Sequence, residues 1–233
     1  MRLPLKTAAL ALALALLCAR PPCFGAASIG GQDGGLLQVF DSAGNSISAM
    51  SLFDGQNTSL RITYIDGTGS LLWERTHSDG YQEHANALAL DPRGGILLAG
   101  MRLWQGSRYF WMMKYSPSGD YLWERSDTTA PGCEASYAAA NEAGEAWVAG
   151  SCVLSDGSYP ARILHLDASG DTLWFQQIYN LGRNYVRGLS VDGLDRAMLA
   201  LAVQGGALSS WGGMSMKTVM YDRSGTKLTS DMP

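Results

Sequence analysis

Short apolar stretches alternate along this chain with polar turns that contain glycine. In KYSPSGDYLWERS (residues 114–126), two apolar strands flank a turn with Gly119, and the second strand carries Trp123. The phrase recurs as TYIDGTGSLLWERT (63–76) and HLDASGDTLWFQQ (165–177), with a weaker copy, MYDRSGTKL, at 220–228. A period of about fifty residues is typical of one supersecondary unit used several times.

A second hairpin precedes each copy. Its turn begins, at spacings of 50, 50 and 51 residues, at Asp41, Asp91, Asn141 and Asp192. An Asp or Asn side chain caps such a turn, and a glycine three residues later accepts the left-handed conformation of a type I turn with a bulge. Gly193 follows Asp192 directly and predicts a different turn type in the fourth repeat.

Each repeat therefore predicts four strands, in the first repeat near residues 36–40, 46–52, 60–65 and 71–75. Sixteen strands result, with the last ending near Leu228. Small apolar residues on both faces of the first hairpins indicate burial, and the charged ends of the fourth strands indicate an exposed rim. No helical periodicity competes after residue 27.

The predicted fold is all-β, a β-propeller of about four four-stranded antiparallel blades, at residues 36–76, 86–126, 135–178 and 185–229. An open solenoid is the alternative architecture. We expect the four blades to close compactly. Two chains could instead share an eight-bladed ring, or the chain could stay an open arc with apolar end faces suited to association.

Several segments resemble a known family of repeats. ALALDPRGGILLAG (87–100), YAAANEAGEAWVAG (137–150) and GLSVDGLDRAMLALAV (188–203) look like the bacterial secreted β-propeller repeats called SBBP, and more distantly like NHL repeats. The resemblance covers nearly all of residues 36–228. It implies a propeller with the first strand of each repeat innermost, and it implies no catalytic residues. Those families usually close with six or seven blades, whereas this chain has four repeats.

The N-terminus has the pattern of a secretory signal peptide. Arg2 and Lys6 precede an apolar run, and small residues follow, so residues 1–27 are the predicted signal, with cleavage after Ala27 or one or two residues earlier. The run is shorter than a membrane span, and Leu17 before Cys18 disfavours a lipoprotein. Residues 28–35 form a Gly-rich lead, and residues 36–233 are the propeller. We expect a secreted or periplasmic protein with no membrane span in the mature chain.

Composition and charge exclude some partners. A hydrophobic content of 46% over 233 residues supports one domain with a sizeable core. The net charge of −4 gives no electrostatic footprint for nucleic acid, which needs clustered Lys and Arg.

The mature chain keeps two cysteines, Cys133 and Cys152, in a compartment that permits disulfides. They flank the first hairpin of the third repeat and lie opposite each other if Ala140 pairs with Glu145. A type I turn with a bulge would shift the register by one and place Cys133 on the other face. We expect a disulfide, with two free buried thiols as the alternative.

The recurring polar and aromatic residues fit structural roles. Trp73, Trp123 and Trp174 recur at spacings of 50 and 51 residues, which favours packing between blades over sugar stacking. The turns at 116–120 and 167–171 offer too few oxygens for calcium. The three histidines lack the spacing of a zinc site, and no G-x-S-x-G motif is present. We therefore predict no catalytic residues, no cofactor and no metal.

The longer loops are the better candidates for binding, because tight turns offer little surface. Loops after the fourth strands carry His77, Tyr81, His84, Arg183 and Tyr185. Loops between second and third strands carry Trp104, Arg108, Tyr109, Tyr159 and Trp211.

In a propeller both sets of loops gather on one face, and aromatic residues and Arg are favoured at interaction hot spots. The alternative is that they cover the blade ends. We expect a non-catalytic scaffold that binds a protein or glycan through this face. The alternatives are an assembly module that completes a propeller as a homo-oligomer, and an enzyme, a hydrolase or lyase, whose site is built from distant loops.

Overall fold

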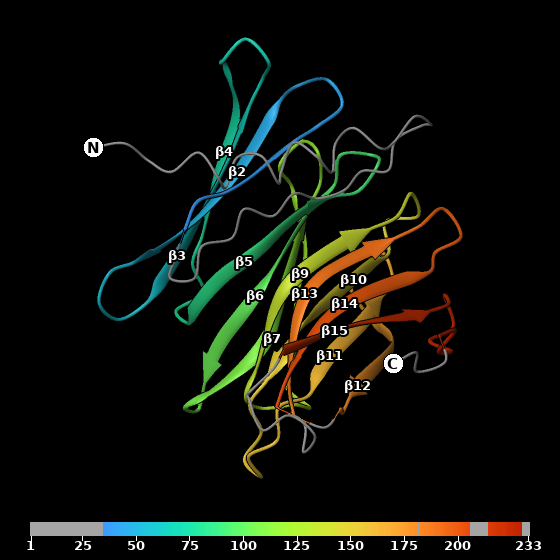
Figure 1. Ribbon diagram of the computed structural model, residues 1–233. Coiled ribbons are helices and arrows are strands. Elements are labelled where there is room, and N and C mark those ends of the chain that lie inside the picture. Colours follow the sequence, from blue (N-terminus) through green and yellow to red (C-terminus); the bar gives the residue numbers. More distant parts are fainter. Residues whose placement is uncertain (1–34, 181, 206–213, 230–233) are drawn as a thin grey trace, which may run out of the picture.

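The computed structural model describes residues 35–180, 182–205 and 214–229, which form fifteen strands in four antiparallel sheets (Figure 1). The first sheet consists of β1 (Leu37–Phe40), β2 (Ser46–Phe53), β3 (Thr58–Ile65) and β4 (Leu71–His77). The second consists of β5 (Gln82–Leu90), β6 (Ile96–Trp104), β7 (Ser107–Tyr115) and β8 (Tyr121–Asp127).

The third sheet consists of β9 (Cys133–Ala140), β10 (Ala146–Cys152), β11 (Ala161–Leu166) and β12 (Thr172–Ile178). The fourth consists of β13 (Arg183–Val191), β14 (Ala197–Gln204) and β15 (Met214–Tyr221). Strands pair in chain order within every sheet, as expected for propeller blades built from two consecutive hairpins. The all-β, propeller-type prediction is therefore confirmed.

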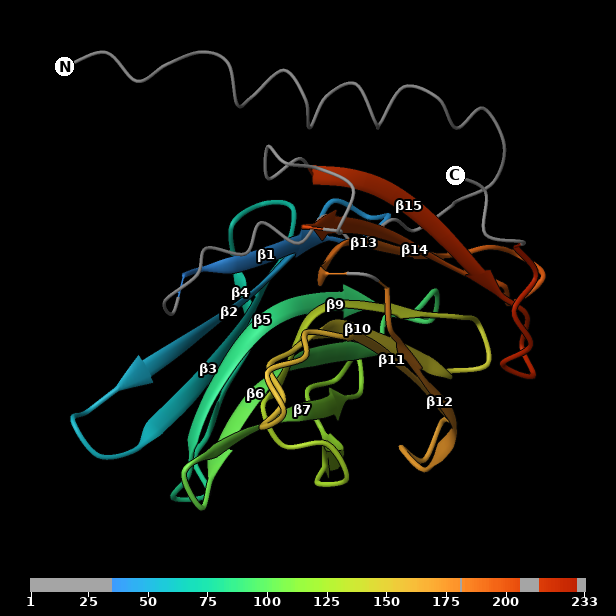
Figure 2. The same cartoon turned by 60° about the horizontal axis from the view of Figure 1, so that its bottom comes forward.

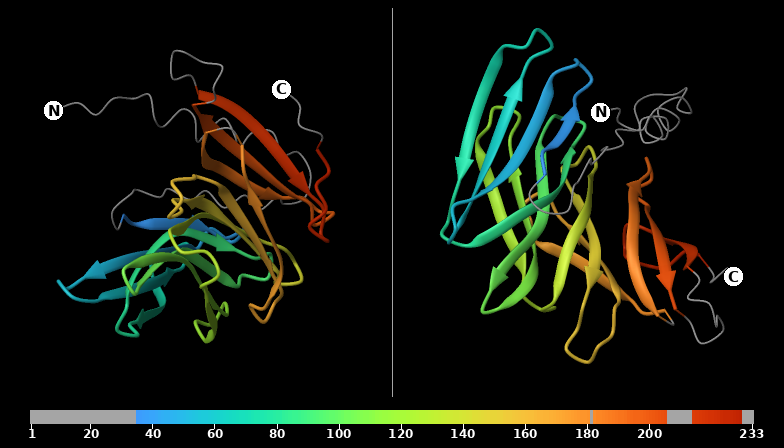
Figure 3. Two further views of the ribbon diagram at one scale, coloured as in Figure 1. Left: turned by 90° about the horizontal axis from the view of Figure 1, so that it is seen from below. Right: turned by 60° about the vertical axis from the view of Figure 1, so that its left-hand side comes forward.

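The sheets pack face to face in chain order and form an open arc. Three apolar cores fill the three junctions between consecutive sheets. Figure 3 (right) shows the order from the blue first sheet to the red fourth sheet, and Figure 2 shows the curvature of the stack. Within the described ranges no fourth core joins the last sheet to the first. The expected compact closure is wrong for this part of the chain.

The fourth sheet departs from the predicted four strands. Up to Thr229, the segment expected to form the last strand makes a single bridge, between Tyr221 and Lys227, and two hydrogen bonds to Met220. Leu228 N donates to Met220 O (2.8 Å), and Met220 N donates to Thr229 Oγ1 (3.2 Å). The expected strand ending near Leu228 is therefore not formed in the described residues. A side-chain difference accounts for the missing strand. The position that holds tryptophan in the other three sheets holds Thr229, which is too short to contact the turn of a following sheet.

The four turns of the first hairpins are alike, which corrects the expectation for Gly193. In the fourth sheet Asp195 N bonds to Asp192 O (3.0 Å), as Gly94 N bonds to Asp91 O in the second (2.8 Å). Asp195 itself takes the left-handed conformation, with φ of 57°. A short polar side chain tolerates that conformation better than most residues do, so the turn forms without glycine at this position.

Each junction is held by the same indole contact. Trp73, Trp123 and Trp174 donate Nε1–H to a carbonyl in the second turn of the next sheet, at 3.0, 2.9 and 2.8 Å. The ring lies against that turn's glycine: a β-carbon added to Gly170 would lie 2.7 Å from Trp123 Cδ2. The glycine is thus required both for its positive φ of 84° and for the approach of the ring. The structural interpretation of the three tryptophans is confirmed.

The predicted disulfide joins Cys133 and Cys152, which are direct partners across β9 and β10. The turn does shift the register, because Ala146 rather than Glu145 pairs with Ala140. A bulge farther along the hairpin shifts it back and returns the cysteines to the same face. The disulfide is compatible with an extracellular or periplasmic location.

The predicted signal peptide lies outside the described residues. No helix long and apolar enough to cross a membrane is present in the residues that the structure describes.

We expect Gly170→Ala to lower the free energy of unfolding by about 2 to 5 kcal/mol, through backbone strain and collision with Trp123. Gly69→Ala is the matched control, since Gly69 has the same turn position and a φ of 91° but nothing within 4 Å. Gly69→Ala should lower the free energy of unfolding by only about 1 to 2 kcal/mol. Denaturant unfolding measures both, and equal losses would contradict the indole contact as the joint.

Replacing both cysteines by alanine should lower the free energy of unfolding by about 3 kcal/mol, because the disulfide closes a loop with a sequence separation of 19. Denaturant titrations with and without a reductant measure this loss. Reductant should destabilise the wild type by a similar amount and leave the double variant unchanged. A double variant as stable as the oxidised wild type would overturn the expectation.

Candidate functional site

The longer loops of the molecule gather at one end of the sheets. Backbone hydrogen bonds join the two loop sets at every junction: Thr58 N to Tyr81 O (3.2 Å), Gly132 N to Arg108 O (2.8 Å) and Asn184 N to Tyr159 O (2.9 Å). Each bond links the start of a third strand to the crossover into the next sheet. The expected gathering of both loop sets at one end is therefore present, but it is divided among three separate junctions.

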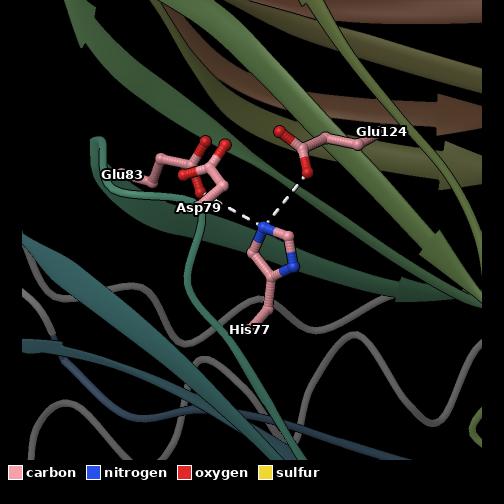
Figure 4. Close-up of side chains that lie close together, drawn as sticks. All are labelled: His77, Asp79, Glu83 and Glu124. Atoms are coloured by element: carbon pink, nitrogen blue, oxygen red, sulfur yellow. Dashed lines mark ion pairs between the residues drawn. The ribbon is translucent and has the colours of Figure 1, made fainter.

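The first junction holds an ionic cluster of His77, Asp79, Glu83 and Glu124, which Figure 4 shows. The Arg102 guanidinium forms ion pairs with its three carboxylates. Arg102 Nε donates to Glu83 Oε1 at 2.5 Å and Nη2 to Asp79 Oδ2 at 2.6 Å, and Nη2 also contacts Glu124. His77 Nε2 lies 3.1 Å from Glu124 Oε2. The cluster links the ends of the first two sheets.

Burial governs the electrostatics of this cluster. The Glu83 side chain is only 3% exposed, and desolvation raises its pKa to about 6 despite the opposing attraction of Arg102. Tyr81 covers the outside, with its ring centroid 4.6 Å from Arg102 Cζ.

The geometry of the cluster also bears on metal binding. One ligand atom from each of the four acidic and histidine residues lies within 4.8 Å of the others, a spacing that an ion could bridge. Because Arg102 contacts all three carboxylates, the chain itself supplies a cation there. We therefore interpret the cluster as a tie between sheets.

The second junction is closed by covalent and ionic links. Beside the disulfide, Arg162 Nε donates to Asp127 Oδ2 at 2.7 Å, and both side chains are buried. Trp104 packs near Tyr109, with ring centroids 5.8 Å apart.

The third junction contains a pocket of about 710 Å³ between the loops of the third and fourth sheets. Its lining consists of Gly157, Ser158, Tyr159, Tyr179, Asn180, Gly182, Arg183, Asn184, Gln204 and Gly205. The Arg183 guanidinium lies 4.3 Å from the Tyr159 ring centroid, and the Tyr179 ring is 60% exposed. The walls thus combine two phenol rings, neutral hydrogen-bonding groups and one cation.

Asn184 positions these walls. It is 2% exposed, and its Nδ2 donates to Tyr159 O (3.0 Å) and Gly182 O (3.1 Å). Its Oδ1 accepts from Asn180 Nδ2 at 2.6 Å. One buried amide therefore ties the loop before β11 to the crossover into β13, and both segments line the pocket.

The ten predicted binding residues do not converge on one site. Tyr159 and Arg183 line the pocket, whereas His77 and Tyr81 belong to the ionic cluster. Tyr185 pairs with Ala202 on the outer face of the fourth sheet. Of the remaining five, His84 lies on β5, and Trp104, Arg108 and Tyr109 lie at the second junction, while Trp211 lies outside the described residues. The binding role of all ten stays a prediction.

Sequence reasoning missed Tyr179, Asn180 and Gln204, although the first two directly follow β12 in a loop of the expected kind. It also missed the pairing of Glu83 with Arg102. That pair occupies the same cross-strand position as Cys133 and Cys152, fifty residues earlier. The register argument applied to the cysteines would have found it.

No protein-family model matches the chain, and no curated protein matches it in sequence. The finer resemblance to SBBP and NHL repeats therefore stays a prediction.

Among solved structures, the chain is similar to an apocarotenoid oxygenase of Synechocystis, with 14% identity over 84% of this chain and a TM-score of 0.48. It is also similar to the β-propeller domain of the trilobed protease from Pyrococcus furiosus, with 8% identity over 88% of this chain and a TM-score of 0.48. The chain spans 50% and 59% of the lengths of those chains. At these values neither neighbour assigns an activity.

The raised pKa of Glu83 predicts a stability that declines with pH. The folded state binds the proton more tightly than the unfolded chain, so this contribution is complete below pH 4.5 and is lost as pH rises through about 6. Relative to Glu83→Gln, the wild type should lose about 2 kcal/mol over this window. Denaturant titrations at several pH values measure the difference. Glu142→Gln, in an exposed turn, is the matched control. A flat difference for Glu83→Gln would contradict the prediction.

Proposed function

We propose that this protein is a non-catalytic propeller-type scaffold that binds a neutral glycan in the pocket between its third and fourth sheets. The observation that carries the proposal is the composition of the lining. Two phenol rings stand beside neutral donors and acceptors from Ser158, Asn180 and Gln204. Such a mixture suits a sugar, whose C–H face packs on an aromatic ring while its hydroxyls accept and donate hydrogen bonds.

The charge of the lining supports a neutral ligand over an acidic or basic one. Arg183 is the one charged side chain among the lining residues, and it is held against the Tyr159 ring. Behind the lining, Asp156 accepts a hydrogen bond from Ser158 Oγ (2.6 Å) and Lys217 Nζ lies 3.5 Å from Asn180 Oδ1. The described charges around the pocket are therefore of both signs, and neither sign predominates. Among the described residues of the lining there is no carboxylate or imidazole to serve as acid, base or nucleophile, which favours binding over catalysis.

The size and openness of the pocket favour a short glycan segment over a protein surface. Its volume of about 710 Å³ lies within the range usual for small-molecule sites. The buried Asn184 fixes the walls in advance, so little ordering is needed when the ligand binds.

The test is a screen of neutral oligosaccharides against the purified protein, followed by calorimetry with the tightest binder. Tyr179→Ala should weaken binding at least about fivefold, from the loss of about 1 kcal/mol of ring contact. Phe40→Ala is the matched control, since Phe40 is an exposed aromatic residue on the first sheet. It should leave binding unchanged. A screen without a binder, or a binder indifferent to Tyr179→Ala, would overturn the proposal.

A further inference from the structure

One position of the repeat carries a polar group that differs from sheet to sheet. Near the end of the third strand, Tyr64, Lys114 and His165 each pair with the tryptophan that reaches the next sheet. Tyr64 OH donates to Asp41 Oδ2 at 2.6 Å, and Lys114 Nζ lies 3.0 Å from Asp91 Oδ2. A phenol and an ammonium keep their protons between pH 5 and 8, whereas an imidazole titrates in this range. Of these three groups, the imidazole of the third sheet is therefore the one that responds to pH.

His165 is enclosed in the core between the third and fourth sheets. It is fully buried, and its ring stacks on Trp147, with centroids 4.0 Å apart and an interplanar angle of 10°. On its other neighbour, Trp174, the ring makes an edge contact with centroids 5.4 Å apart. Trp174 is also the residue that donates its indole hydrogen to Arg223 O in the fourth sheet, at 2.8 Å. Water can therefore reach the imidazole only when the two sheets part locally.

One ring nitrogen of His165 has a partner and the other has none. Nε2 lies 3.2 Å from Glu145 Oε2, whereas Nδ1 is buried without a hydrogen bond in the described part of the chain. Burial would raise the pKa of Glu145, but the hydrogen bond and the charge of Arg223 hold that pKa below its usual value. The carboxylate thus stays ionised near neutral pH and accepts the proton of Nε2, which leaves Nδ1 unprotonated.

A second proton, on Nδ1, would lack a free acceptor. The Arg223 carbonyl favours this proton, but it already accepts the Trp174 indole hydrogen. Burial accordingly lowers the pKa of His165 below its usual value of 6.5, against the attraction of Glu145. Because the folded state holds this proton less tightly than the unfolded chain does, the resulting stability is complete above pH 6.5. It is lost as the pH falls from there through the lowered pKa.

The charged groups around His165 cross the junction. Glu145, in the first turn of the third sheet, forms an ion pair with Arg223 in the second turn of the fourth. Arg223 Nη1 also lies 3.7 Å from Asp195 Oδ2, and Asn141 Nδ2 donates to Asp195 Oδ1 at 2.9 Å. An imidazolium at His165 would compete with Arg223 for the Glu145 carboxylate and with Trp174 for the Arg223 carbonyl. Both competitions weaken bonds that join the third sheet to the fourth.

We propose that the third junction is an acid-sensitive joint, in which protonation of His165 Nδ1 loosens the contact of the third sheet with the fourth and weakens binding in the pocket. The effect on binding rests on the proposed function, whereas the loosening does not. The pocket is exposed to this change because its walls come from both sheets, with Tyr159 before β11 and Arg183 in β13. A ligand held near neutral pH is then released in acid.

Hydrogen exchange of the indole N–H groups, followed by NMR without any ligand, tests the loosening. Trp123 and Trp174 make the same bond to the next sheet, at 2.9 and 2.8 Å, so Trp123 corrects for the intrinsic effect of pH on exchange. From pH 7 to pH 5, the ratio of the Trp174 rate to the Trp123 rate should rise at least about tenfold. A ratio that stays constant in the wild type overturns the proposal.

His165→Gln supplies an amide that can donate to Glu145 but does not titrate, so its exchange ratio should stay constant with pH. His84→Gln, on β5, is the matched control and should behave as the wild type. Circular dichroism checks that both variants are folded. Titration of the imidazole resonances in the wild type provides a test that needs no variant. His165 should titrate below pH 6.5, and a midpoint at or above 6.5 overturns the proposal.

Calorimetry with the tightest neutral oligosaccharide, at pH 7 and pH 5, tests the effect on the pocket. The dissociation constant should rise at least about tenfold in acid for the wild type and stay constant for His165→Gln. An unchanged dissociation constant beside a rising exchange ratio refutes the effect on binding. A screen without any binder refutes the proposed function, whereas a constant exchange ratio refutes the acid-sensitive joint, so the two failures are distinguished.

Discussion

The contact between a tryptophan and the turn glycine of the next sheet is the constraint on which this structure depends. It has a direction: each indole reaches forward in the chain, from Trp73, Trp123 and Trp174 to the turns of Gly119, Gly170 and Gly225. Three joints therefore connect four sheets, and the two ends cannot be equivalent. The first sheet offers a turn that no described tryptophan covers, and the last sheet offers no tryptophan. The missing fourth joint is consistent with an open arc in the described part of the chain.

One cross-strand pair recurs at the equivalent position of the second, third and fourth sheets, but its residues differ in each. The cross-strand pair near the long-loop end is Glu83 with Arg102 in the second sheet, Cys133 with Cys152 in the third, and Asn184 with Val203 in the fourth. The ion pair and the disulfide both tie loops directly to their own sheet. Asn184 instead donates hydrogen bonds to two loop carbonyls, and it is itself part of the pocket lining. The scaffold is thus constant, while the chemistry of this pair changes from an ion pair to a disulfide to a hydrogen-bonding amide.

The sequence permits prediction of whatever the repeat itself determines. Turn glycines, strand order and the packing role of the tryptophans follow from spacing, because each repeat meets the same local sterics. Closure does not follow from spacing, since it depends on side chains at non-repeated positions such as Ser48 and Thr229. The sequence predicts only part of the pocket lining. Tyr159 and Arg183 lie in long loops, which are candidate binding sites from sequence alone. Gln204 lies at the end of a strand, and only the packing of two sheets brings it near them. The bulge that realigns Cys133 with Cys152 is likewise a tertiary feature, set where Gly150 approaches the backbone of Glu134.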